Sequence, residues 1–83
     1  MKVEYTPTAT RQFLALSRQD QKRISIKMRF YATQDDSLSF AKPLVGSPLY
    51  RFRIGDFRII FEVVSKVIWI LKIVKRDQAY RDL

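Results

Sequence analysis

The sequence of 83 residues contains no cysteine and no histidine. Without cysteine, the chain has neither a disulfide framework nor a thiolate nucleophile. Without histidine, it lacks the commonest general base and the commonest metal ligand of proteins. The sequence therefore predicts no metal site and no small-molecule cofactor, and any chemistry must depend on other side chains.

Long apolar runs are also absent. The longest, Val67–Leu71, is far too short to span a bilayer, and the first residues lack the hydrophobic region of a signal peptide. We therefore expect a cytoplasmic protein with no membrane partner. A hydrophobic fraction of 47% is normal for a folded protein, and the length predicts a single domain over residues 1–83.

Acidic residues are scarce relative to basic ones. The chain has 16 Lys and Arg against 8 Asp and Glu, which gives a formal net charge of +8. The excess of positive charge lies in residues 18–31 and 51–81, whereas the remainder is nearly neutral. Such a charge indicates a polyanionic partner: nucleic acid, a membrane surface or an acidic protein.

Two helix starts follow a short alternating strand at residues 2–5. Thr6–Pro7 combines an N-cap with proline at the first helical position, and it predicts a helix that ends near Leu16. Ser17 is a second good N-cap and predicts a helix that ends near Ala32. Helices joined so closely form a helical hairpin. The apolar stripe expected on the second helix consists of Ile24, Met28 and Tyr31. Ile26 and Phe30 flank this stripe, and Phe30 is also expected in the core.

The segment 49–63, LYRFRIGDFRIIFEV, alternates on both sides of Gly55–Asp56 and predicts a β-hairpin with a two-residue turn. In this register Arg53 lies opposite Arg58, although like charges opposite one another destabilise a strand pair. Arg51 shares their face, and the other face is apolar. Because arginine presents a planar fork to phosphate oxygens, three guanidinium groups together indicate anion binding. The alternative interpretation is an ordinary solvated outer face.

A last strand is predicted over residues 67–74, and the preceding loop decides which of its side chains face the core. A three-residue loop pairs Phe61 with Trp69 and places Lys72 beside the arginines. A two-residue loop would instead push Lys72 into the core, at a large desolvation cost. We therefore expect the three-residue loop. The apolar side chains that it turns toward the core are Trp69, Leu71 and Ile73.

The predicted order of elements is β-α-α-β-β-β, with residues 33–48 as an irregular loop. This order gives an α+β fold in which the helical hairpin packs on one face of an antiparallel sheet. The opposite face is expected to be open and cationic. The second helix carries further positive charge, for which a solvated surface is the more common explanation. Near the C-terminus, Tyr80 either packs the tail on the sheet or stacks on an RNA base.

The hairpin combines a basic-x-basic strand, a Gly-Asp-aromatic-Arg turn and an apolar strand, and ILKIVKRDQAY follows it. With the order of elements, this pattern resembles the RelE/ParE toxin superfamily of bacterial type II toxin–antitoxin systems, over the whole chain. The resemblance implies a RelE-like fold and a cognate antitoxin protein as partner. It also implies one of two activities: cleavage of mRNA in the ribosomal A site, or non-catalytic inhibition of DNA gyrase. A degenerate, non-toxic member is a third possibility.

The residues favour the endonuclease branch, whose 2′-OH attack on the adjacent phosphorus leaves a cyclic phosphate. The resemblance assigns its catalytic positions to Arg51, Arg53, Arg58, Arg76 and Tyr80. The lysines expected to bind RNA are Lys72, Lys75, Lys27 and Lys22. The first two catalytic positions are often lysine in this family, and arginine stays protonated, so Arg51 and Arg53 are poor general bases. Lys72, Lys75 or Tyr80 is then the candidate proton acceptor.

Overall fold

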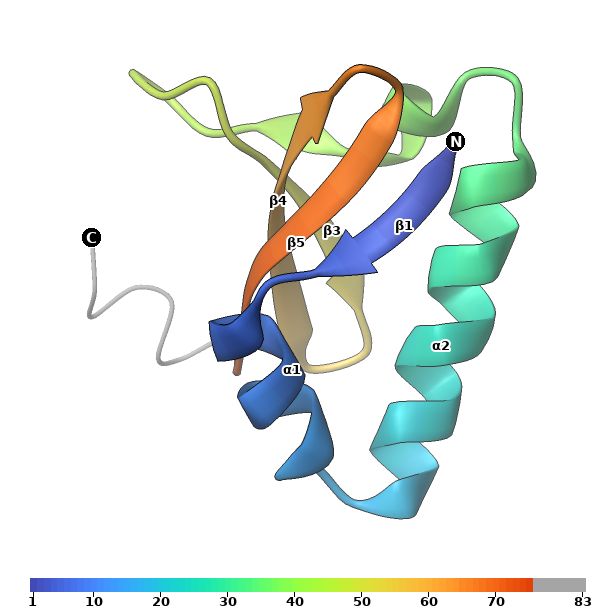
Figure 1. Ribbon diagram of the computed structural model, residues 1–83, viewed down its shortest axis with the longest axis vertical. Coiled ribbons are helices and arrows are strands. Elements are labelled where there is room, and N and C mark those ends of the chain that lie inside the picture. The colour runs from blue at the N-terminus through green and yellow to red at the C-terminus, as the bar shows by residue number, and fades with distance from the viewer. Residues whose placement is uncertain (76–83) are drawn as a thin grey trace.

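The computed structural model describes residues 1–75, which form two helices packed on a five-stranded sheet (Figure 1). Arg76 and Tyr80 lie outside the described residues. The strands lie in the order β1-β5-β4-β3-β2. No helix within residues 1–75 is long and apolar enough to cross a membrane. The elements are β1 (Lys2–Tyr5), α1 (Pro7–Leu14), α2 (Arg18–Thr33), a 3-10 turn η1 (Ser37–Phe40), β2 (Lys42–Pro43), β3 (Tyr50–Ile54), β4 (Phe57–Val64) and β5 (Val67–Lys75).

Both helices begin at the predicted N-caps. Thr6 Oγ1 accepts a hydrogen bond from the amide of Ala9 at 3.2 Å, and Ser17 Oγ accepts one from the amide of Asp20 at 3.1 Å. These bonds satisfy amides that have no partner inside a helix. The first helix ends at Leu14, two residues before the predicted end. The predicted stripe of α2 is buried, namely Ile24, Met28 and Tyr31, whereas Phe30, also expected in the core, is 48% exposed.

The first helix also covers the edge of the sheet. Because β1 pairs in parallel with residues 67–70 of β5, the second half of β5 has no strand on that side. Thr6 donates its amide to the carbonyl of Ile70 at 3.0 Å, and Gln12 Oε1 accepts from the amide of Ile73 at 2.7 Å. The N-cap residue and the Gln12 side chain of α1 therefore satisfy backbone groups that a bare strand edge would expose. The sequence predicted neither this edge nor the parallel pairing.

The β3–β4 hairpin has the predicted register. Ile54 pairs with Phe57 across a two-residue turn, and Arg53 pairs with Arg58. Gly55 adopts φ +58° at the first turn position, where a type II′ turn requires a positive φ. The hairpin residues in the core are Phe52, Ile54, Phe57, Ile59 and Phe61.

The predicted loop between β4 and β5 is wrong. The turn has two residues, Ser65 and Lys66, whose φ values of 51° and 64° fit a type I′ turn. Phe61 pairs with Ile70, whereas Trp69 pairs with Glu62 and faces away from the helices. Ile68 and Ile70 enter the core in place of the predicted Trp69 and Leu71, whereas Ile73 is in the core as predicted.

A β-bulge explains why the short loop does not bury Lys72. The register shifts between Ile60 and Phe61, so that Leu71 is an extra residue on β5 without a partner. An extra residue reverses the side-chain alternation beyond it. Lys72 consequently pairs with Ile60 and lies on the arginine side, as predicted, although for a different reason. The prediction had assumed a regular ladder.

Residues 33–48 contain the 3-10 turn and the short β2, rather than an irregular loop alone. A series of stacked rings joins this segment to the core. Tyr31 stacks on Phe40 and on Phe52 at ring-centroid distances of 5.1 and 4.5 Å, and Phe52 stacks on Phe61 at 4.3 Å. The 3-10 turn is therefore attached to both α2 and the hairpin.

Candidate anion-binding site

Four basic side chains share the sheet face opposite the helices. Arg53, Arg58 and Val74 form one row across β3, β4 and β5, and Arg51, Ile60 and Lys72 form the next row. Adjacent strands lie about 4.8 Å apart, so Arg53 and Arg58 are direct neighbours, whereas Ile60 separates Arg51 from Lys72. We call this set the arginine face: Arg51, Arg53, Arg58 and Lys72.

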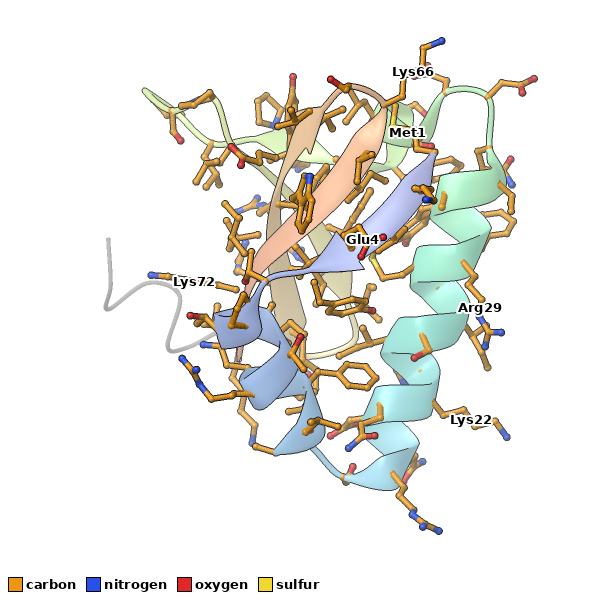
Figure 2. The ribbon with its side chains drawn as sticks, viewed as in Figure 1. Met1, Glu4, Lys22, Arg29, Lys66 and Lys72 are labelled. Carbon is orange, nitrogen blue, oxygen red and sulfur yellow. The ribbon has the colours of Figure 1, made fainter. Side chains whose placement is uncertain are left out.

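The four side chains differ in exposure, so the face that was expected to be open is open only in part. Arg58 is only 2% exposed, Arg51 is half-buried, and Arg53 and Lys72 are exposed. Lys72 projects from the sheet on the side away from α2 (Figure 2). A buried Arg58 fixes positive charge at one position, whereas Arg53 and Lys72 are accessible to a ligand. Charge that is already in place needs no rearrangement when an anion binds.

The remaining lysines do not join this face. Lys75 is the last residue of β5 and pairs with Phe57, which places it on the helix side of the sheet. Lys22 and Lys27 are exposed on α2. Lys22 and Lys72 point to opposite sides of the molecule (Figure 2). The predicted RNA-binding set is therefore split between two surfaces.

The arginine face covers only the half of the sheet near Gly55. In the other half Glu62, Trp69 and Glu4 are adjacent in register on β4, β5 and β1. This acidic and aromatic row limits the cationic area on one side. The sequence did not predict it, because Trp69 was expected in the core.

A further basic side chain reaches the hairpin from α2. A Cβ atom at Gly55 would lie 2.9 Å from Nη1 of Arg23 and 3.5 Å from its Cδ. Arg23 therefore rests against the turn, two residues along β3 from Arg53. Because Arg23 and Gly55 are far apart in the chain, no local pattern indicates this contact. The turn glycine both adopts a positive φ and leaves room for the guanidinium group.

The site residues offer no metal ligands. Within residues 1–75, no group of three or more Asp or Glu side chains is placed to hold a metal ion. The arrangement of the arginine face suits electrostatic stabilisation of an anion by fixed and exposed guanidinium groups.

The same fold occurs in solved structures of RelE toxins. The RelBE2 toxin–antitoxin complex of Mycobacterium tuberculosis gives a TM-score of 0.75 at 22% identity, covering 90% of this chain and 96% of that chain. The archaeal RelE–RelB complex of Pyrococcus horikoshii gives 0.73 at 27% identity, covering 90% and 93%. The isolated RelE toxin of E. coli gives 0.74 at 12% identity, covering 99% and 98%. The protein thus has a RelE-like fold.

A family model extends this similarity to the sequence. The model described as the ParE toxin of the type II toxin–antitoxin system parDE matches residues 3–80. No curated protein is similar enough in sequence to count as a match. Because the family model covers nearly the whole chain, the protein belongs to the RelE/ParE family of type II toxin–antitoxin toxins.

Proposed function

We propose that the protein is an mRNA endonuclease that cuts ribosome-bound mRNA in the A site and so inhibits translation. The observation that carries this proposal is the Arg53–Arg58 pair, because two arginines lie directly opposite each other on β3 and β4, where like charges repel. Like charges held together in this way are stabilised when an anion lies between them. A scissile phosphate is such an anion, and arginine binds it in a bidentate manner.

The reaction requires in-line attack of the 2′-OH on phosphorus and stabilisation of the charge that develops on the phosphate oxygens. Arg53 supplies an exposed fork to a non-bridging oxygen, and buried Arg58 adds a fixed positive charge behind it. In this proposal Arg51, in the neighbouring row, also stabilises the negative charge that develops on the phosphate oxygens. Arg76 stabilises the leaving 5′-oxygen, and Tyr80 stacks on or orients a base.

Lys72 is the preferred proton acceptor among described residues. It is exposed and lies on the row next to the Arg53–Arg58 pair, whereas Lys75 lies on the other side of the sheet. Lys72→Met should therefore lower the cleavage rate.

The partners proposed are the ribosome with its mRNA and a cognate antitoxin, with the cytoplasm as the compartment. The solved M. tuberculosis and P. horikoshii relatives are toxin–antitoxin complexes, which supports an antitoxin for this chain as well. A protein with a net charge of +8 is complementary to an acidic antitoxin that is partly disordered when free.

The test is induction of the protein in growing cells, with translation and mRNA 5′ ends measured within minutes. We expect translation to stop and new 5′ ends to appear inside codons of translated mRNA. The same measurement on Arg53→Ala should show neither effect. Intact mRNA after induction of the unaltered protein would contradict the endonuclease.

Inhibition of DNA gyrase is the second candidate function, because the matching family model is that of ParE toxins. In that case the basic side chains bind an acidic protein surface and no bond is broken. The same induction experiment separates the two functions when plasmid supercoiling and the SOS response are also followed. SOS induction with intact mRNA supports gyrase as the target.

A further inference from the structure

Three large apolar side chains are exposed together on the side of α2 that faces away from the sheet. Ile26 and Phe30 are 50% and 48% exposed and lie one helical turn apart. Phe40 of η1 is 43% exposed, and its ring centroid is 5.8 Å from that of Phe30. We call this set the α2 strip: Ile26, Phe30 and Phe40.

Basic side chains surround the strip. Residues three and four positions apart are neighbours on a helix surface, so the helix neighbours of Ile26 are Lys22, Arg23, Arg29 and Phe30. Lys27 is in turn a neighbour of Phe30. Lys22 and Arg29 point away from the sheet (Figure 2). Asp20 is the only acidic residue of α2, against five basic ones.

We propose that the α2 strip docks an acidic amphipathic helix, whose apolar ridge lies on Ile26 and Phe30 and whose carboxylates pair with the surrounding cations. Recognition of this kind joins apolar anchors at helical spacing with complementary charge. The helix would come from the antitoxin, so this inference rests on the partner proposed above. It assigns Lys22 and Lys27 to a protein partner rather than to RNA.

The composition of the strip favours a peptide helix over RNA or a membrane. Ile26, at one end of the strip, has no aromatic face on which a base could stack. One face of Phe40 is already covered by Tyr31, at 5.1 Å and 26° between ring planes. A membrane-binding helix needs a broad apolar face, whereas α2 offers two half-exposed apolar residues among cations.

The test uses a labelled peptide of about 16 residues, long enough to form a helix, with leucines on one face and glutamates on both flanks. A peptide of the same composition in shuffled order is its control. The double variant Ile26→Ser/Phe30→Ser should bind the amphipathic peptide about 10-fold more weakly than the unaltered protein, because both apolar anchors are lost. Lys22→Glu should also weaken binding, whereas Arg53→Ala on the other surface should leave it unchanged.

Two controls keep this test decisive. Thermal unfolding followed by circular dichroism shows that the variants are folded, and Lys22→Glu alters only an exposed side chain. At about 0.5 M salt, where exposed charges are screened, the apolar part of the binding should persist. No saturable binding, equal binding of the shuffled peptide, loss of binding in Arg53→Ala, or displacement by single-stranded RNA or anionic vesicles would each overturn the proposal. Toxicity is measured separately, so none of these outcomes decides whether the protein cleaves mRNA.

Discussion

The molecule carries positive charge on two surfaces, which differ in the kind of side chain that lies beside the charged groups. On the arginine face, cations lie in register on neighbouring strands, and one of them is buried. Around the α2 strip, cations surround half-exposed apolar side chains. Net charge attracts any polyanion to either surface. Closely spaced guanidinium groups suit a compact anion such as phosphate, whereas cations around an apolar ridge suit an acidic helix.

The largest expected effect is a loss of mRNA cleavage, which should follow from a substitution on the arginine face but not from one on α2. Arg53→Ala should lower mRNA cleavage by about 10²–10³, by analogy with the loss of one donor to a developing charge. Arg29→Ala removes the same charge from α2, on the opposite side of the molecule, and should leave cleavage nearly unchanged. Mapping of mRNA 5′ ends in a purified translation reaction measures both rates. An equal loss in the two variants would mean that only the net charge matters.

The next effect compares two arginines of one cross-strand pair. Arg58 is 2% exposed, so Arg58→Ala should reduce the free energy of unfolding by about 1–3 kcal/mol, as loss of a buried side chain usually does. Arg53 is exposed, and Arg53→Ala should change it by less than about 0.5 kcal/mol. Urea unfolding followed by circular dichroism gives both values. Equal stabilities would show that the buried guanidinium group has no structural role, and a loss of activity in Arg58→Ala would then be purely functional.

A smaller effect tests the contact of Arg23 with the hairpin tip. Gly55 and Gly46 have similar φ values, +58° and +72°, but only Gly55 has a neighbour, Arg23, within 4 Å of an added Cβ atom. Alanine at either position should cost about 1–2 kcal/mol of stability from the left-handed backbone. Gly55→Ala should cost more, because Arg23 must also move. In an Arg23→Ala background that excess should vanish; if it persists, Arg23 is not its cause.

The elements that the sequence predicted are those governed by nearby residues. The helix caps at Thr6 and Ser17 each bond an amide three residues away, and the β3–β4 register follows from one glycine turn. Local chemistry of this kind is visible in the sequence itself. The fold class and the grouping of Arg51, Arg53 and Arg58 follow from it.

The features that the sequence did not predict depend either on two irregularities that offset each other or on contacts between residues far apart in the chain. Ser65–Lys66 forms a tight turn without glycine or asparagine, and the bulge at Leu71 then restores the side-chain alternation. The short turn and the bulge each shift the side-chain alternation of β5 by one residue, and beyond the bulge the two shifts cancel. Lys72 therefore lies on the predicted face, whereas Trp69, which precedes the bulge, lies on the opposite face from the one predicted. The burial of Arg58 and the reach of Arg23 depend on segments far away in the chain, for which no local pattern exists.

The smallest effect concerns Tyr5, which connects the surroundings of the α2 strip to the core. Burial raises the pKa of Tyr5 above its usual 10.0, and the positive charge of Arg29 partly opposes this shift. The folded state therefore disfavours the tyrosinate. The buried, protonated Tyr5 contributes its full stabilisation of the fold below about pH 10, where the unfolded chain also keeps the phenol protonated. That stabilisation is lost as the pH rises through the raised pKa of Tyr5.

Tyr5→Phe should consequently unfold at the same urea concentration near neutral pH and lose less stability than the unaltered protein at about pH 11. Arg29→Ala should make the alkaline loss steeper, because the cation that favours the tyrosinate is gone. Comparison of each variant with the unaltered protein at both pH values cancels the titration of the lysines, which the three proteins share. An unchanged alkaline slope in Arg29→Ala would mean that the charges around the α2 strip act only on its partner and have no influence on the core.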